Sequence, residues 1–94
     1  MRPTVLHTLL PRGRAEILRL LFTNPRAELF VRELARLNFL SLHTVRQELD
    51  ILTRAGLLVN RTNGYQKFYR ANPAHPLYTT LRRLVVKAAR LRER

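Results

Sequence analysis

The apolar positions in the middle of the chain repeat with the period of an α-helix. Three of them recur at i, i+4 and i+7 and form one apolar stripe, so the opposite face is polar: Val45, Leu49 and Leu52. Ser41 stands where an N-cap accepts hydrogen bonds from the free N–H groups of a first turn, and Gly56 suits the left-handed residue that ends a helix. The pattern predicts a helix over residues 41–55 whose apolar stripe is buried.

A β-hairpin is predicted directly after this helix. Asn63-Gly64 is the strongest short signal for a tight turn, and it predicts hairpin strands over residues 57–61 and 65–71. Residues 29 and 30 predict a short strand that pairs with the hairpin. The aromatic residues of the hairpin are expected to pack on the sheet rather than stack on bases: Tyr65, Phe68 and Tyr69.

Two helices are predicted before residue 41, over residues 12–22 and 31–37, and Leu34 and Leu37 of the second are expected to point inward. Phe39 or Leu40 would fill the gap in the turn that follows. Residues 1–11 have helix-spaced apolar positions between prolines, which predict a short helix or a packing arm.

A last helix is predicted over residues 76–94, with Pro76 in its first turn. Its apolar stripe comprises Leu81, Leu84, Val85, Ala88 and Leu91. Because three helices and a hairpin already close a small core, this stripe requires another surface. The candidates are the first helix of the same chain, a partner subunit, or both.

The order of these segments resembles the winged helix-turn-helix transcriptional regulators, most closely their arsenical-repressor-like (ArsR-like) branch. There a Ser-x-x-Thr-Val-x-x-x-Leu-x-x-Leu-x-x-Ala-Gly-Leu run forms the recognition helix and its exit, and residues 41–57 match it position by position. The resemblance covers residues 12–72. It implies a mainly α fold with a small β-hairpin, namely a winged helix-turn-helix with an added C-terminal helix. At 94 residues, the chain has the length of a single domain, residues 1–94.

The charge of the chain indicates which kind of partner it binds. The net charge is +12, with 16 arginines against 2 lysines, which favours a polyanionic partner. Residues 29–56 carry only +1, whereas residues 1–28 and 57–72 carry +3 each and residues 73–94 carry +5. We therefore expect the flanks to contact phosphates and the helix of residues 41–55 to contact base edges.

The resemblance implies a regulator that binds specific sequences of double-stranded DNA. The helix of residues 41–55 would lie in the major groove, and the wing, residues 57–71, on the backbone or in the minor groove. Gln47 and Arg46 match base-contacting positions, since glutamine suits adenine and arginine suits guanine. Arg32 at a helix N-terminus is a candidate phosphate contact. The full candidate set is Arg32, Ser41, His43, Thr44, Arg46, Gln47, Arg61 and Lys67. Glu48 and Asp50 are expected to pair with arginines, because acids facing phosphate would repel it.

Other chemistry is disfavoured by what the sequence lacks. Without cysteine there can be neither a disulfide nor a thiolate metal site, and His7, His43 and His75 are too scattered to suggest another metal site. No catalytic constellation or glycine-rich phosphate loop is present, so we expect neither an enzyme nor a cofactor. The absence of a signal-like or membrane-spanning run predicts a cytoplasmic protein without membrane contact.

Several alternatives stay open. The added C-terminal helix favours a homodimer, and a winged helix can also serve as an adaptor that holds another protein. Residues 70–77 and 84–87 resemble sequences in which such a domain precedes a small nucleotidyltransferase-like domain. RNA binding is disfavoured, because readers of single-stranded RNA display aromatics on an open sheet and here aromatics make up only 7%. The operator and any effector are not indicated.

Overall fold

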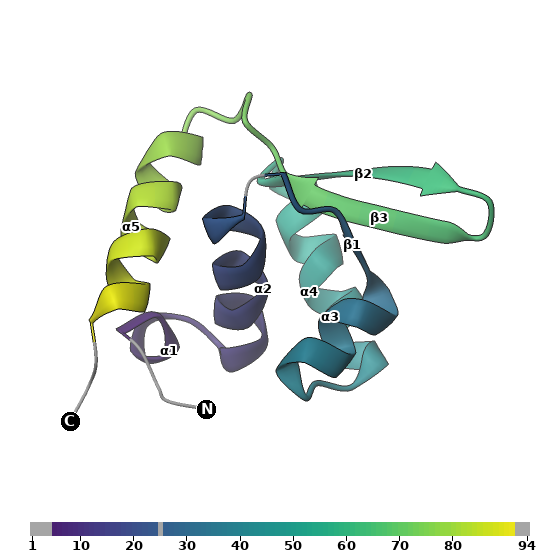
Figure 1. Ribbon diagram of the computed structural model, residues 1–94, viewed down its shortest axis with the longest axis horizontal. Coiled ribbons are helices and arrows are strands. Elements are labelled where there is room, and N and C mark those ends of the chain that lie inside the picture. Colours follow the sequence, from purple (N-terminus) through teal and green to yellow (C-terminus); the bar gives the residue numbers. More distant parts are fainter. Residues whose placement is uncertain (1–4, 25, 92–94) are drawn as a thin grey trace.

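The computed structural model describes residues 5–24 and 26–91, which form five helices and three strands (Figure 1). In chain order they are α1 (Val5–Leu9), α2 (Arg12–Thr23), β1 (Leu29–Phe30), α3 (Val31–Asn38), α4 (Leu42–Arg54), β2 (Leu58–Asn63), β3 (Gln66–Ala71) and α5 (Tyr78–Arg90). The predicted mainly α class with a small sheet and an added C-terminal helix is confirmed.

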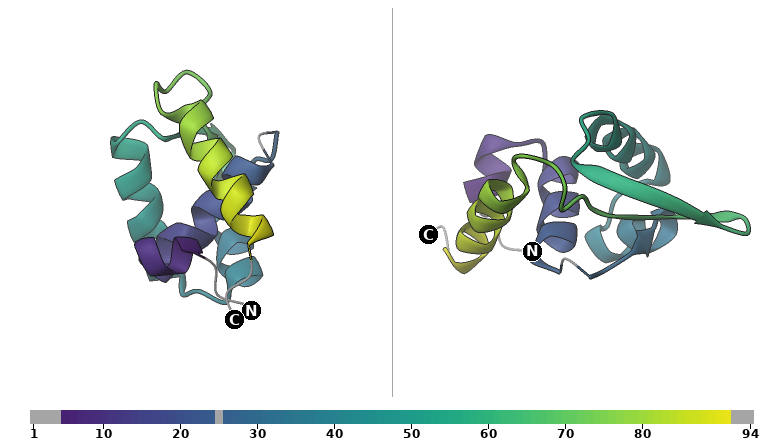
Figure 2. Two further views of the ribbon diagram at one scale, coloured as in Figure 1. Left: turned by 90° about the vertical axis from the view of Figure 1, so that its left-hand side faces the viewer. Right: turned by 90° about the horizontal axis from the view of Figure 1, so that it is seen from above.

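Helix α2 lies at the centre of the molecule. It packs against α5 on one side and against α3 and α4 on the other, as Figures 1 and 2 show. The β2–β3 hairpin extends from the α3–α4 side, along the longest molecular dimension of 44 Å. The wing therefore points away from α5, and these two elements mark opposite ends of the molecule.

The three strands form an antiparallel sheet in the order β1-β3-β2. Leu29 pairs with Tyr69 and Phe30 with Phe68, which confirms the predicted short strand. Strands β2 and β3 pair over their whole length, as far as the Asn63–Gln66 pair at the tip. The hairpin thus continues beyond its last contact with β1 as a two-stranded ribbon.

The tip of the hairpin differs from the prediction. Asn63 lies in β2, so the two turn residues are Gly64 and Tyr65. Gly64 has φ 64° at the first central position, the place that a type II′ turn gives to glycine. Tyr65 consequently projects from the tip and is fully exposed, and the prediction that it packs on the sheet is wrong. Tyr69 is buried and Phe68 half-buried, as expected.

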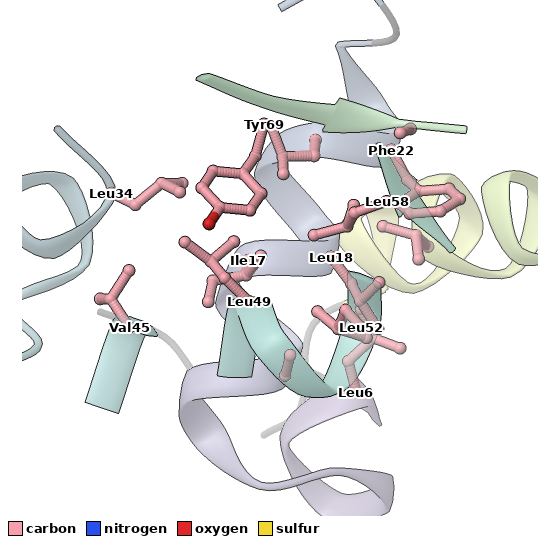
Figure 3. Close-up of a cluster of buried hydrophobic side chains, with 14 of the residues drawn as sticks. Leu6, Ile17, Leu18, Phe22, Leu34, Val45, Leu49, Leu52, Leu58 and Tyr69 are labelled. Atoms are coloured by element: carbon pink, nitrogen blue, oxygen red, sulfur yellow. The ribbon is translucent and has the colours of Figure 1, made fainter. Parts of the chain in front are cut away.

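The core gathers around α2 and α4 (Figure 3). All three residues of the predicted α4 stripe are buried, together with Leu34 of α3. The inward prediction for Leu37 is wrong, since its side chain is 48% exposed. Asn38 completes the buried face of α3 instead, because its side-chain amide donates to the Leu34 carbonyl at 2.9 Å.

The turn between α3 and α4 settles which of two residues fills the gap. Phe39 adopts a left-handed φ of 55° and its side chain is exposed, whereas Leu40 packs against the core. After α4, Gly56 adopts φ 78°, as predicted for the residue that ends this helix.

Helix α5 begins at Tyr78, two residues later than predicted, because residues 72–77 are held in turns. There the His75 Nδ1 atom accepts from the Leu77 N–H at 3.0 Å. Residues 92–94 of the predicted helix lie outside the described part of the chain. Leu81, Val85 and Ala88 pack against the core of their own chain, whereas Leu84 stays exposed. Most of the stripe therefore follows the intrachain alternative.

Candidate nucleic-acid interface

The exposed face of α4 carries polar side chains at helical spacing. His43, Arg46, Gln47, Asp50 and Arg54 follow one another at i, i+3, i+4, i+7 and i+11, opposite the buried stripe. This face can present donors and acceptors to a large concave partner, because all five side chains are exposed.

The first turn of α4 is fixed by Ser41 and Thr44. The Ser41 Oγ atom accepts from the Thr44 N–H at 3.0 Å and donates to the Thr44 Oγ1 atom at 2.9 Å. The Thr44 methyl group lies against α2, where a Cβ added to Gly13 would be 3.1 Å from it. Ser41 thus caps the first turn of α4, and Thr44 packs that turn against α2.

An ion pair fixes α4 further along its length. The Arg14 Nε atom donates to the Glu48 Oε2 atom at 2.7 Å and ties α2 to α4, so the predicted pairing of Glu48 is confirmed. Asp50 has no side-chain ion pair within residues 5–24 and 26–91, and its predicted pairing is wrong. It lies on the outer face of α4, and Arg54 donates only to its backbone carbonyl.

Helix α3 presents a second basic group. The Glu33 Oε1 atom accepts from the Phe30 N–H at 3.1 Å, so that this carboxylate closes the start of the helix. Arg32 lies exposed in the same turn, where the free N–H groups of the helix end favour an anion.

A groove of about 590 Å³ lies between α4, the start of α3 and the wing. Its basic residues come one from each element, Arg32 from α3, Arg46 from α4 and Lys67 from β3. Asp50 is the acid of the lining and faces the buried Tyr69. The pKa of Tyr69 is raised above its usual 10, first by burial and then by the charge of Asp50. With three cations and one carboxylate, the groove has a net positive charge that suits a polyanion.

Arg61 does not line this groove. It is the cross-strand partner of Phe68, which strand alternation places on the opposite face of the sheet from Lys67. Its Nε atom donates to the Glu28 Oε2 atom at 2.7 Å, and its guanidinium lies 4.9 Å from the centre of the Phe68 ring. The Glu28 hydrogen bond raises the pKa of Arg61, and the pKa of Glu28 is lowered first by the same bond.

The predicted set therefore divides into three groups. Arg32, Arg46 and Lys67 surround one groove, with His43 and Gln47 on the neighbouring α4 face. Ser41 and Thr44 fix the first turn of α4, and Arg61 is paired on the other sheet face. Sequence reasoning missed Glu28 and the groove position of Asp50. The pairing with Glu28 spans 33 residues, and the only signal for it is the strand register, which requires the turn at Gly64 and Tyr65.

The described residues show neither a cluster of metal ligands nor a membrane-spanning helix. Within residues 5–24 and 26–91, no three His, Asp or Glu side chains gather as a metal site would require. Nor does any helix of this part of the chain have the length and apolar character needed to cross a bilayer.

A central α2, the α3–α4 pair with its exposed polar face, and a β-hairpin beside it define a winged helix-turn-helix protein. Solved structures show the same architecture. Reduced HlyU from Vibrio cholerae N16961 is 27% identical, with a TM-score of 0.71 over 93% of this chain and 88% of that chain. The transcriptional repressor BigR from Xylella fastidiosa shares the fold at 24% identity, with a TM-score of 0.70 over 95% of this chain and 86% of that chain.

A third similar structure is a possible transcriptional regulatory protein from Mycobacterium bovis (fragment 1–100). It is 26% identical, with a TM-score of 0.57 over 90% of this chain and 94% of that chain. No protein-family model matches the chain, and neither does any curated protein. The resemblance of the sequence to winged helix-turn-helix regulators is thus confirmed at the level of structure, over nearly the whole chain.

Proposed function

We propose that this protein is a transcriptional regulator of the ArsR-like branch that binds specific sequences of double-stranded DNA. Helix α4 enters the major groove, and the wing contacts the backbone or the adjacent minor groove. The groove between α4 and the wing, with Arg32, Arg46 and Lys67 around it, is the observation that carries the proposal. Two structures with similar folds, described as a repressor and a possible regulator, support it.

The geometry of a duplex explains why the groove matters. One sugar-phosphate strand separates the major groove from the neighbouring minor groove. A helix in one and a hairpin over the other therefore place that strand in the space between them, where cations fix the register of the protein. In this chain that space is lined by Arg32 and Lys67, while the exposed α4 face is left for base edges.

Base preference would come from the N-terminal half of α4, which reaches deepest into the major groove. Gln47 can form a bidentate contact with adenine and Arg46 with guanine, and His43 lies one turn earlier on the same face. Ser41 and Thr44 serve this contact indirectly, because they fix the first turn of the helix that carries it.

Selection from a library of random DNA duplexes tests the function. The proposal predicts enrichment of a defined site, and binding of that site that weakens steeply between 50 and 200 mM salt, the range over which phosphate contacts are screened. A protein that retains no duplex at any salt concentration would contradict the proposal. That result would favour the adaptor function, in which the same fold holds another protein.

We further propose that the protein acts as a homodimer through α5. Leu77, Leu84 and Leu91 are exposed and repeat every seven residues. They border the half-buried Leu81 and the buried Val85, so the apolar surface of α5 continues from the core to solvent. Soluble monomers avoid such surfaces, and a second copy of the chain would cover this one.

The position of α5 suits this assembly. It lies at the end of the molecule opposite the wing, so a pair joined there keeps both wings free (Figure 1). Two recognition helices about 34–36 Å apart would then meet successive turns of one duplex face.

Sedimentation at micromolar concentration tests the dimer. The wild type should sediment as a dimer of 11.1 kDa chains, and Leu84→Asp as a monomer. Thr79→Asp is the matched control, because it adds the same carboxylate to an exposed position about 140° away around the helix. A wild type that runs at 11.1 kDa would remove the dimer proposal and leave DNA binding by the monomer to be tested separately.

A further inference from the structure

The three-stranded part of the sheet ends at Phe68, and the wing extends beyond this residue as two strands. Strand β1 pairs with β3 only at Tyr69 and Phe68, while the β2–β3 ladder continues to the Asn63–Gln66 pair. Beyond Phe68, the described part of the chain places no third strand beside the hairpin. Contacts that cross the sheet at Phe68 are therefore placed to set the angle between the hairpin and the rest of the fold.

Arg61 makes such a contact. It lies on β2 opposite Phe68, and its guanidinium passes over the Phe68 ring to reach the Glu28 carboxylate, which precedes β1. Because the strand order is β1-β3-β2, β2 and β1 have no backbone pairing, and this side chain links them across β3. Phe30 of β1 packs edge-on against the same ring, with the ring centres 5.7 Å apart.

We propose that Glu28 and Arg61 form a clasp across the sheet that sets the angle of the wing relative to α3 and α4. Arg61 is then a positioning residue of the DNA-binding surface, in place of the direct DNA contact predicted from the sequence. The role in DNA binding rests on the function proposed above. The clasp itself is a property of the free protein.

The connection from the clasp to the groove is short. Helix α3 begins directly after Phe30, and Glu33 holds the Phe30 N–H, so β1 and the start of α3 move together. Arg32 lies in that first turn, and Lys67 lies on the hairpin just beyond the Arg61–Phe68 pair. The clasp therefore fixes the spacing of two groups that line the same groove.

The charge of Arg61 is already balanced in this arrangement. The Glu28 carboxylate accepts the Arg61 hydrogen bond, which is the main cause of its lowered pKa, and the charge of Arg70 lowers that pKa further. An exposed ion pair adds little to the stability of a whole domain. Its effect should thus appear locally, in the opening of the hairpin, rather than in the melting temperature.

Hydrogen exchange of the free protein tests the clasp. Amides of residues 62–67 should exchange roughly two- to fivefold faster in Glu28→Gln and in Arg61→Gln, the scale of one exposed ion pair. The double variant should exchange no faster than either single variant, because each one already opens the clasp. Arg70→Gln is the matched control, since it removes a positive charge near Glu28 and leaves the clasp intact. Wild-type exchange in both single variants would overturn the proposal.

Salt-dependent DNA binding separates positioning from direct contact. Arg61→Gln should weaken binding to all duplexes without changing the slope of log affinity against log salt. Lys67→Gln should lower that slope by about one unit. A loss of about one unit in Arg61→Gln would overturn the positioning role. If the wild type binds no duplex, the proposed function fails, while the exchange experiment still decides the clasp.

Discussion

Leu49→Ala offers the sharpest test of how α4 is oriented. Leu49 is 0% exposed and belongs to the core cluster shown in Figure 3, so the substitution removes three buried carbon atoms from a site closed on all sides. Truncations of this kind cost about 2–5 kcal/mol, a large part of the ~5–15 kcal/mol that stabilises a domain. At ~4–8 °C per kcal/mol for a chain of this size, a loss of ~3 kcal/mol lowers the melting temperature by roughly 12–24 °C.

Thermal unfolding followed by circular dichroism measures this loss. Ile51→Ala on the same helix is the matched control, because it shortens a side chain that is already 37% exposed and should cost below about 1 kcal/mol. Both variants must be compared at one protein concentration, since dimerisation would couple stability to concentration. Equal losses of melting temperature in the two variants would refute the assignment of buried and exposed faces on α4.

Three further predictions concern single interactions. Ser41→Ala should cost ~1 kcal/mol in urea unfolding because the N-cap acceptor is lost, whereas Ser41→Asp should retain most of the stability; equal losses would contradict the cap. Gly56→Ala should lower the melting temperature by more than Ser41→Ala, because φ 78° is strained for alanine and the new Cβ would lie 3.3 Å from the His75 ring; an unchanged value would contradict this. The pKa of Glu28 is lowered below its ordinary 4.5, so the clasp is present above that value and is lost as pH falls through the lowered pKa. The ratio of the wing-amide exchange rates of the wild type to those of Glu28→Gln should rise only below about pH 4.5. A ratio that does not change with pH would count against the clasp.

The helices and the buried side of α4 could be predicted because their signals are local. Val45, Leu49 and Leu52 repeat with the helical period, and Ser41 and Gly56 mark the ends by capping chemistry that acts within one turn. The short strand at residues 29 and 30 was also predictable, since a hairpin with one buried face needs a neighbour. The helix positions depend on residues a few places away along the chain, whereas the strand at residues 29 and 30 pairs with the distant residues 68 and 69.

The remaining features depend on side-chain hydrogen bonds and on strand register, which the apolar pattern does not encode. Leu37 and Asn38 are adjacent in the sequence, and the choice between them rests on a side-chain bond to the Leu34 carbonyl that hydrophobicity does not encode. A shift of one residue in the turn moved Tyr65 from the sheet to the tip. The partner of Arg61 follows from that same register, so neither its face nor Glu28 could be predicted before the turn was placed.

Binding of the selected duplex by two variants, measured over a range of salt concentrations, tests most directly whether α4 reads bases while the groove holds phosphates. Gln47→Ala should reduce discrimination against substituted base pairs by ~1–3 kcal/mol and leave the salt slope unchanged. Lys67→Ala should weaken all duplexes alike and lower the slope by about one unit. If Lys67→Ala changed the base preference and Gln47→Ala changed only the slope, the roles assigned to helix and wing would be contradicted.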